Sequence, residues 1–275
     1  MCIRDRYWGH MNLRERVDRF FIAQFEGLSL DQADEMDILE ANGSVNFGSN
    51  KAYRAMLKKI KAGSPATNPD DLQYILDNVD VDNLFEYMAL EMFVGNSDIG
   101  NIRYYRLHQE GSKWKWIWYD ADYGLYSSKF NSPWSYLKVK GMGEQKIDNT
   151  IFLKLLEHPD YKRKFLEKLA DVYKTFTTEY MTQVLDGVVA EIQPEMKNHW
   201  ERWGELNDKA VTSEVPTTID GAYTYWESRV NRLYNTLKVR PHRLWDFIKD
   251  EFKLTKTEME ELFGPQPDYP DDAVL

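Results

Sequence analysis

The sequence predicts an α+β fold, in which one β-hairpin separates short N-terminal elements from a long helical region. Two aromatic-rich runs, 102–107 and 114–119, flank the turn-forming stretch Gln109-Glu110-Gly111-Ser112, which is a hairpin pattern. Helical spacing then dominates the chain from residue 149 to residue 251. With 275 residues, of which 43% are hydrophobic, the chain is long enough for one large domain or two small ones.

The first elements are a helix and a strand. Asn12 with Glu15 three residues later is a capping-box pattern, and apolar residues continue at helical spacing, so we expect a helix over 12–25. The run 36–40 is typical of a short strand, and Asn42-Gly43 behind it indicates a turn.

Three further helices are expected before the hairpin. Ser49 caps one that runs through Lys61, and Pro69 opens a second by first-turn chemistry. The third covers 82–94 and carries a broad apolar face, which predicts burial. A polar, glycine-flanked loop over 95–101 follows it.

The hairpin leads into an acidic turn, Asp120-Ala121-Asp122-Tyr123-Gly124. The stretch 127–148 predicts a long irregular loop. Helices are expected over 149–157, 160–175, 177–200, 218–237 and 241–251, punctuated by Pro159, Pro194, Pro216 and Pro241. The acidic, proline-containing tail 264–275 is expected to be disordered.

Charge and cysteine content exclude several function classes. Asp and Glu outnumber Lys and Arg by 45 to 35, and a net charge of −10 disfavours general nucleic-acid binding. Cys2 is the only cysteine, so neither an internal disulfide nor a thiolate metal site is available. The five histidines show no metal-binding spacing, and no apolar run is long enough for a membrane span.

Oxygen-bearing side chains flank the hairpin at both ends. Asp98 and Asn101 precede its first strand, while Asp120 and Asp122 follow its second. Because antiparallel pairing brings the two ends of a hairpin together, these four residues are expected to face one small volume. Carboxylate and amide oxygens are the ligands that Mg²⁺ prefers. The pattern therefore predicts a divalent-metal site.

The flanking residues resemble those of a known family. The segments 95–106 and 113–124, which read GNSDIGNIRYYR and KWKWIWYDADYG, resemble the core signature of the CotH kinases. These proteins are named for a spore-coat protein and are distant relatives of protein kinases. The segment 7–18 resembles the family's strand-to-helix region, and 151–252, with Arg240 and Pro241, resembles its helical bundle. The resemblance covers most of the chain.

The resemblance implies a role for each candidate residue. Asp98 matches the family's catalytic Asp, and Asp120 matches its metal-binding Asp. Asn101 and Asp122 are implied as further metal or water ligands. Glu15 is implied as the helix Glu that pairs with a nucleotide-binding Lys, and a capping-box acid is an equal reading of it.

Arg103 is implied as a phosphate contact, although an exposed hairpin position is its simpler interpretation. Asp98 and Asn101 also fit a turn that holds no metal, and Asp122 fits a structural acceptor for backbone amides. Trp114, Trp116 and Trp118 share one strand face and are expected in the core rather than on a sugar-binding surface.

The implied fold is an atypical protein-kinase-like fold with a truncated small lobe and a mainly helical large lobe. We expect a partial small lobe over 1–80, the catalytic lobe over 81–263 and a tail over 264–275. The family's first strands and its phosphate-contacting Lys should precede Tyr7, so the chain is expected to lack part of its nucleotide cleft. Asn101 follows Asp98 by three residues, whereas conventional kinases use a spacing of five.

The function implied is a protein kinase that uses ATP with Mg²⁺ or Mn²⁺ to phosphorylate Ser or Thr of a protein. The family also implies an extracellular or cell-surface setting. A non-catalytic, pseudokinase-like binding or structural module is the alternative. A metal-dependent hydrolase is a weaker third hypothesis, because it needs further acids or histidines that the sequence does not offer.

Overall fold

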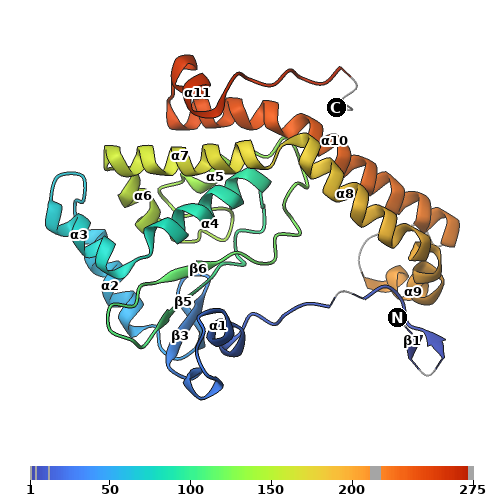
Figure 1. Cartoon of the computed structure of the whole chain (residues 1–275), viewed down its shortest axis with the longest axis horizontal. Helices are drawn as coiled ribbons and strands as arrows, with labels where there is room; N and C mark the ends of the chain where they lie inside the picture. Colours follow the sequence, from blue (N-terminus) through green and yellow to red (C-terminus); the bar gives the residue numbers. More distant parts are fainter. Residues whose placement is uncertain (1, 4, 12, 211–217, 272–275) are drawn as a thin grey trace. The chain divides into compact units, whose positions relative to one another are not determined.

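The computed structural model describes residues 2–3, 5–11, 13–210 and 218–271. These residues form two compact units, whose elements are labelled in Figure 1. The smaller unit takes its residues from 1–15, 176–239 and 269–275, and the larger unit comprises 16–175 and 240–268. The expected boundary at residue 80 falls inside the larger unit and remains a prediction about lobes.

The larger unit is built on a four-stranded antiparallel sheet in the order β4-β3-β5-β6. Strand β3 spans Met36–Glu40, β4 spans Ser44–Phe47, β5 spans Arg103–Leu107 and β6 spans Lys115–Ile117. The predicted hairpin and the strand over 36–40 are thus confirmed, and β4 is an additional edge strand. The mixture of helices with a small antiparallel sheet confirms the α+β class.

Each face of this sheet is covered by helices. On one face, Ile22 and Ala23 of α1 (Arg19–Phe25) pack in one cluster with Ile38 and Tyr105. On the other face, Tyr53 of α2 (Lys51–Ala62) lies 5.1 Å from Trp114, measured between ring centroids. Aromatic side chains therefore fix the sheet from both sides.

Helix α4 (Val81–Val94) joins the sheet to the helical layer, as Figure 1 shows. Its Phe85 makes edge contacts with Phe152 and Phe165, which belong to α6 and α7. The other elements of this unit are η1 (Leu30–Gln32), α3 (Pro69–Asn78), α5 (Ser132–Tyr136), α6 (Thr150–Leu156), α7 (Pro159–Thr175) and α11 (Lys256–Phe263).

The smaller unit is mainly helical. It contains β1 (Cys2–Ile3), β2 (Arg6–Tyr7), α8 (Thr178–Ile192), η2 (Gln193–Glu195), α9 (Met196–Ala210) and the first part of α10 (Ile219–Phe252). The indole of Trp203 donates to the carbonyl of Trp8 at 2.7 Å, which ties the N-terminal residues to α9. None of the described helices has the length and apolar character needed to cross a bilayer.

The expected start of the first helix is wrong. Asp18 is the actual N-cap of α1, because its carboxylate accepts from the amides of Phe20 and Phe21. Asn12 lies outside the described residues, and Glu15 lies in irregular, exposed chain ahead of the helix. The capping-box interpretation of Glu15 is therefore corrected: a later Asp takes the capping position.

The expected helix break at Pro241 is also wrong, since α10 runs through it. Proline has no amide hydrogen, which frees the carbonyl four residues earlier. That carbonyl, of Leu237, accepts from the hydroxyl of Thr178 at 3.1 Å. A side chain thus replaces the missing helical bond, and the helix continues.

Three smaller expectations are adjusted. Helix α5 lies within the stretch expected to be an irregular loop. Trp114 and Trp116 are buried as expected, but Trp118 is 43% exposed. In the tail, the Pro267 carbonyl lies 2.7 Å from a ring nitrogen of His242.

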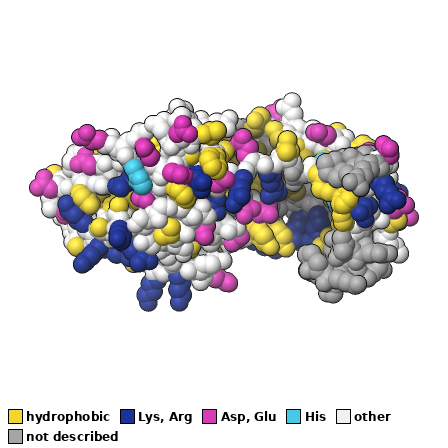
Figure 2. Space-filling view, turned by 90° about the horizontal axis from the view of Figure 1, so that it is seen from below, with side chains coloured by type: hydrophobic (Ala, Val, Ile, Leu, Met, Phe, Trp, Pro, Cys, Tyr) yellow, Lys and Arg dark blue, Asp and Glu magenta, His cyan; other side chains and the backbone are white. Residues whose placement is uncertain are grey.

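Figure 2 shows acidic and basic side chains intermingled on one face, so the net charge of −10 is not gathered there into one patch.

Candidate active site

The two ends of the hairpin meet as the sequence predicts. The side-chain amide nitrogen of Asn101 donates to Asp98 at 2.8 Å and to Asp120 at 2.9 Å. One amide group thus bridges two carboxylates that are 22 residues apart in sequence. We call residues 95–101 the Asp98 arm and residues 120–125 the Asp120 arm.

The Asp98 arm begins at the C-terminal end of α4. Gly95 is the C-cap in the left-handed conformation, with φ of +64°, which glycine adopts without steric cost. The side-chain oxygen of Asn96 then accepts from the amide of Asp98 at 3.0 Å. Asn96 is only 2% exposed, so the position of Asp98 is fixed from inside the protein.

Asn96 is held in turn by a buried polar network. The hydroxyl of Tyr136 donates to the Glu91 carboxylate at 2.6 Å and lies 3.3 Å from the Asn96 carbonyl. Burial raises the pKa of Glu91, and hydrogen bonds from Tyr136, Asn96 and Trp118 oppose that rise only in part. A carboxyl group that resists ionisation therefore lies beneath the arm.

Arg240 clamps the same helix end. Its guanidinium donates to the carbonyls of Phe93 at 2.7 Å and Met92 at 2.8 Å. It also donates to the Phe130 carbonyl and the Ser132 hydroxyl. Arg240 is 2% exposed, and burial lowers its pKa to about 10. The cation complements the negative end of the helix dipole.

The four terminal carbonyls of α4 are therefore all satisfied, as a buried helix end requires. Glu91 accepts from the amide of Gly95, and Met92 and Phe93 accept from Arg240. Val94 accepts from the amide of Leu125 at 2.6 Å. This last bond attaches the Asp120 arm to the helix end that carries the Asp98 arm.

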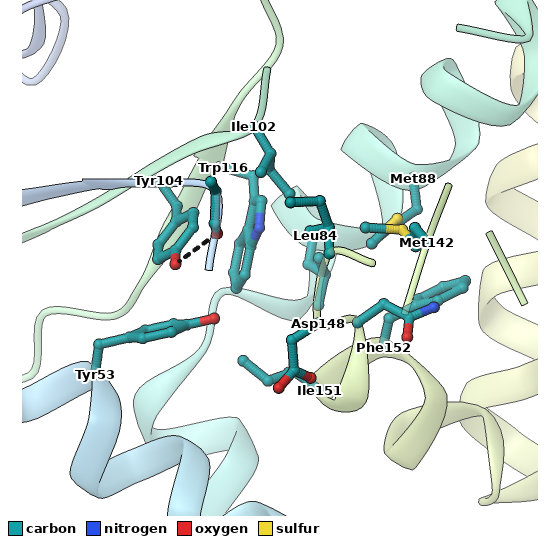
Figure 3. Close-up of a pocket in the computed structure, with 13 residues that line it drawn as sticks. Tyr53, Leu84, Met88, Ile102, Tyr104, Trp116, Met142, Asp148, Ile151 and Phe152 are labelled. Carbon is teal, nitrogen blue, oxygen red and sulfur yellow. Dashed lines mark hydrogen bonds between the residues drawn. The ribbon is translucent and has the colours of Figure 1, made fainter. Parts of the chain in front are cut away.

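Packing behind the Asp98 arm leaves little space. A small cavity lies next to Ile102 and is lined by Met88, Met142 and Trp116, among others (Figure 3). Its volume of about 10 Å³ corresponds to one water molecule. The region is thus a packed support and has no room for a substrate.

The Asp120 arm is more exposed. Asp120 itself is exposed and has φ of +54°, a conformation that is uncommon for residues other than glycine. A tight turn follows, in which the Gly124 amide donates to the Ala121 carbonyl at 2.8 Å. Strained residues of this kind cluster at functional sites, so the conformation is consistent with a functional Asp120.

Asp122, a further predicted ligand, is not bonded to the pair. Asp122 is exposed in the turn, and within the described residues it forms no hydrogen bond or ion pair with Asp98, Asn101 or Asp120. Glu15 belongs to the smaller unit. Their roles as a metal ligand and a nucleotide-site residue stay predictions.

Arg103 is engaged by protein groups. Its guanidinium donates to the Val17 carbonyl, pairs with Glu40 at 3.2 Å and lies 4.9 Å from the centroid of the Tyr119 ring. Burial raises the pKa of Tyr119; the Arg103 cation lowers it, and Glu40, Asp120 and Asp98 raise it further. Glu40 and Tyr119 thus belong to the surroundings of the site.

The side chains at the bridge are carboxylates and an amide, which are donor types that a divalent cation takes. Among the described residues, no three His, Cys, Asp or Glu side chains form a group that could hold a metal. Asp98 and Asp120 nevertheless converge on one point, where the Asn101 amide nitrogen now satisfies both. A cation beside that point would be held by the Asp120 carboxylate, with the Asn101 amide oxygen, water and phosphate oxygens as further donors. The residues therefore fit a metal held jointly with a phosphate ligand.

Sequence reasoning missed the residues that support the arms. Glu91 sits in an apolar helix and gives no motif. Arg240 lies 148 residues from its partner Met92, a separation that no local pattern reveals. A polar Asn96 directly behind a glycine helix cap was the one available signal.

Comparison with known families gives one match. The profile of the family described as CotH kinase protein matches residues 1–244, which include both arms and Arg240. Comparison with curated proteins and with solved structures gives no match.

Proposed function

Because the chain belongs to the CotH kinase protein family, whose members are protein-kinase-like, we propose that it transfers the γ-phosphoryl group of ATP to a Ser or Thr hydroxyl of a protein. The observation that supports this most is the bridge from Asn101 to both Asp98 and Asp120. It holds a candidate base and a candidate metal carboxylate in one small volume.

Asp98 has the role of orienting the acceptor hydroxyl and receiving its proton. The hydroxyl oxygen forms a bond to the γ-phosphorus as the bond between that phosphorus and the β,γ-bridging oxygen breaks, and ADP leaves. The Asn96 side chain holds the backbone of Asp98, so the base needs little reorganisation to reach the acceptor.

Asp120 has the role of the main metal ligand, with Asn101 and Asp122 as additional ligands. Mg²⁺ or Mn²⁺, when bound with ATP, neutralises charge on the phosphates. For Asn101 to contribute its oxygen, its amide must turn over from the orientation seen here. We further propose that Arg103 contacts phosphate after leaving Glu40, and that Glu15 serves the nucleotide site.

The setting follows from the family. Its spore-coat association suggests a protein acceptor at a cell or spore surface. The overall fold proposed is kinase-like, with α4, the hairpin and the helical layer forming the larger, catalytic lobe.

Labelling with γ-labelled ATP, Mg²⁺ and a Ser/Thr-rich acceptor such as casein tests this function. Asp98→Ala is expected to reduce labelling by about 10²–10⁴-fold, and Asp120→Asn by about 10²–10³-fold. Asp120→Asn tolerates the same backbone conformation, so its unfolding midpoint should stay near wild type. Equal labelling by all three proteins would refute the proposal.

A non-catalytic binding module is the second candidate. It is favoured by the absence, within the described residues, of three clustered metal-binding side chains. Thermal unfolding with and without Mg-ATP separates the two. If the protein is a kinase, Mg-ATP should raise the unfolding midpoint of wild type but not that of Asp120→Asn. If it is a module that binds no nucleotide, Mg-ATP should shift the midpoint of neither protein.

A further inference from the structure

A second, larger cavity lies in the sheet-containing unit, between α1, α4 and the outer edge of β6. Its volume is about 430 Å³, which is within the range of about 300–1,000 Å³ for small-molecule sites. The walls are mostly apolar and aromatic, with contributions from Phe21, Phe25, Tyr87, Leu90, Ile117 and Trp118. Phe25 is 73% exposed and Trp118 is 43% exposed, so the pocket is open to solvent.

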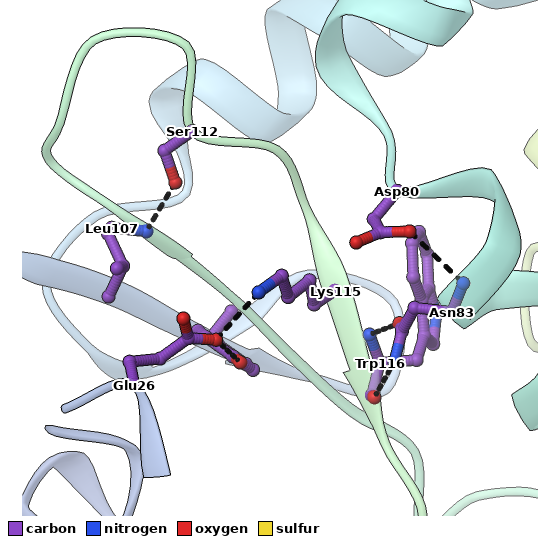
Figure 4. A network of polar contacts seen from close by, with 8 residues as sticks. Glu26, Asp80, Asn83, Leu107, Ser112, Lys115 and Trp116 are labelled. Atoms are coloured by element: carbon purple, nitrogen blue, oxygen red, sulfur yellow. Dashed lines mark hydrogen bonds and ion pairs between the residues drawn. The ribbon is translucent and has the colours of Figure 1, made fainter. Parts of the chain in front are cut away.

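One wall of the pocket is fixed by the Asn83 side chain, which pairs with the backbone at the edge of β6 as a neighbouring strand would. Asn83 of α4 accepts from the amide of Trp116 at 2.6 Å and donates to the carbonyl of the same residue at 3.1 Å (Figure 4). Both polar groups of Trp116 on the free edge of β6 are thereby paired. The distance between helix and strand is set, and the pocket needs no rearrangement to form.

A second fixed contact engages Lys115, which is the one cationic side chain among the described residues that line the pocket. The Lys115 amine donates to Glu26 at 2.7 Å (Figure 4), and the hydroxyl of Tyr105 donates to the same carboxylate. Burial raises the pKa of Glu26, but the hydrogen bonds from Lys115 and Tyr105 outweigh this and hold the pKa below its ordinary value. The positive charge of Lys115 is thus balanced by the Glu26 carboxylate within the protein.

The remaining charges on the lining are negative. Asp80 caps α4, with one carboxylate oxygen accepting from the amide of Asn83 at 3.1 Å, and Glu86 lies in the second turn of the helix. An apolar, ring-lined pocket with two carboxylates at its border complements a molecule that is apolar at one end and cationic at the other.

We propose that this pocket binds a small amphipathic cation, in which an aromatic or branched apolar group carries an ammonium or guanidinium group. The apolar group fills the space between Phe21, Leu90 and Trp118. The cation faces Asp80 and Glu86. This site is separate from the proposed chemistry at Asp98, and its occupancy does not require that chemistry.

Two probes of similar size and opposite charge test the proposal on the full chain. 2-Phenylethylamine and 3-phenylpropionate share a phenyl group and differ in the charged end. Titration followed by tryptophan fluorescence and by calorimetry should show the amine binding at least about tenfold more tightly, given two carboxylates at the border. No binding of the amine, or equal binding of both, would overturn the proposal.

Variants locate the binding. Glu86→Gln preserves shape and should weaken binding of the amine by about fivefold, while binding of the carboxylate probe should not weaken. Leu90→Trp fills the pocket and should abolish binding, and its unfolding midpoint checks that it folds. Trp118→Phe should remove the fluorescence change, and Asp98→Ala should leave binding unchanged. Full binding by Leu90→Trp would place the ligand elsewhere.

Discussion

The two arms of the candidate active site are built in opposite ways. The Asp98 arm rests on buried groups, with Asn96 and Arg240 each 2% exposed. The Asp120 arm is exposed, begins at a residue with φ of +54° and is attached to α4 through the amide of Leu125. The contrast suggests that one carboxylate is positioned by the core, while the other is positioned by strand register and has freedom to adapt to a ligand.

The largest test of this contrast is Arg240→Met. The change removes a buried donor from the carbonyls of Met92, Phe93 and Phe130, and we expect a loss of about 3–5 kcal/mol in unfolding free energy. Urea denaturation measures it. Arg163→Met is the matched control, because the Arg163 ion pair with Glu167 is exposed and should matter little. A similar loss in both variants would contradict a clamp at α4.

An intermediate effect is expected from Gly95→Ala. The backbone is left-handed here, and a Cβ atom would lie 2.5 Å from the Arg240 guanidinium. Gly27→Ala has a comparable φ of +70° but open space around it, so it reports the backbone cost alone, about 1 kcal/mol. Gly95→Ala should cost about 1–3 kcal/mol more. Thermal unfolding of the two variants gives the difference in stability loss. Equal losses would mean that the Arg240 side chain moves away from the new methyl group without cost.

The smallest effect concerns pH. The folded-state pKa of Glu91 is raised above about 4.5, so its contribution to stability is complete below that pH and is lost as pH rises through the folded pKa. Glu91→Gln keeps the shape without the titration. The unfolding free energy of wild type relative to Glu91→Gln should therefore fall as the pH rises from about 4.5 through the raised folded-state pKa. A constant difference would show that Glu91 does not titrate in this range.

The sequence predicted the structure correctly where the pairing or turn depends on residues that are close together in the chain. Hairpin pairing alone brings residues 98 and 120 together, and Asn42-Gly43 marks a turn that the structure confirms. Local patterns misled where another side chain competed for the same backbone groups. Asp18 displaced the predicted cap of the first helix, and the hydroxyl of Thr178 rescued α10 at Pro241.

The residues that hold the Asp98 arm were beyond prediction for a related reason. Arg240, Ser132 and Tyr136 reach α4 from far along the chain. Their residue types occur in many surroundings, so only the folded arrangement shows that they share one buried network. The ligand roles of Asn101 and Asp122 remain predictions.

The distance between Arg240 and α4 along the chain also has a consequence for biosynthesis. Ribosomes deliver the chain from its N-terminus, so Asp98, Asn101 and Asp120 all emerge before the guanidinium that clamps α4. Until Arg240 is translated, the carbonyls of Met92 and Phe93 lack the guanidinium that donates to both. Support of the Asp98 arm is therefore complete only after Arg240 has been synthesised, and nascent fragments that end before Arg240 lack this clamp.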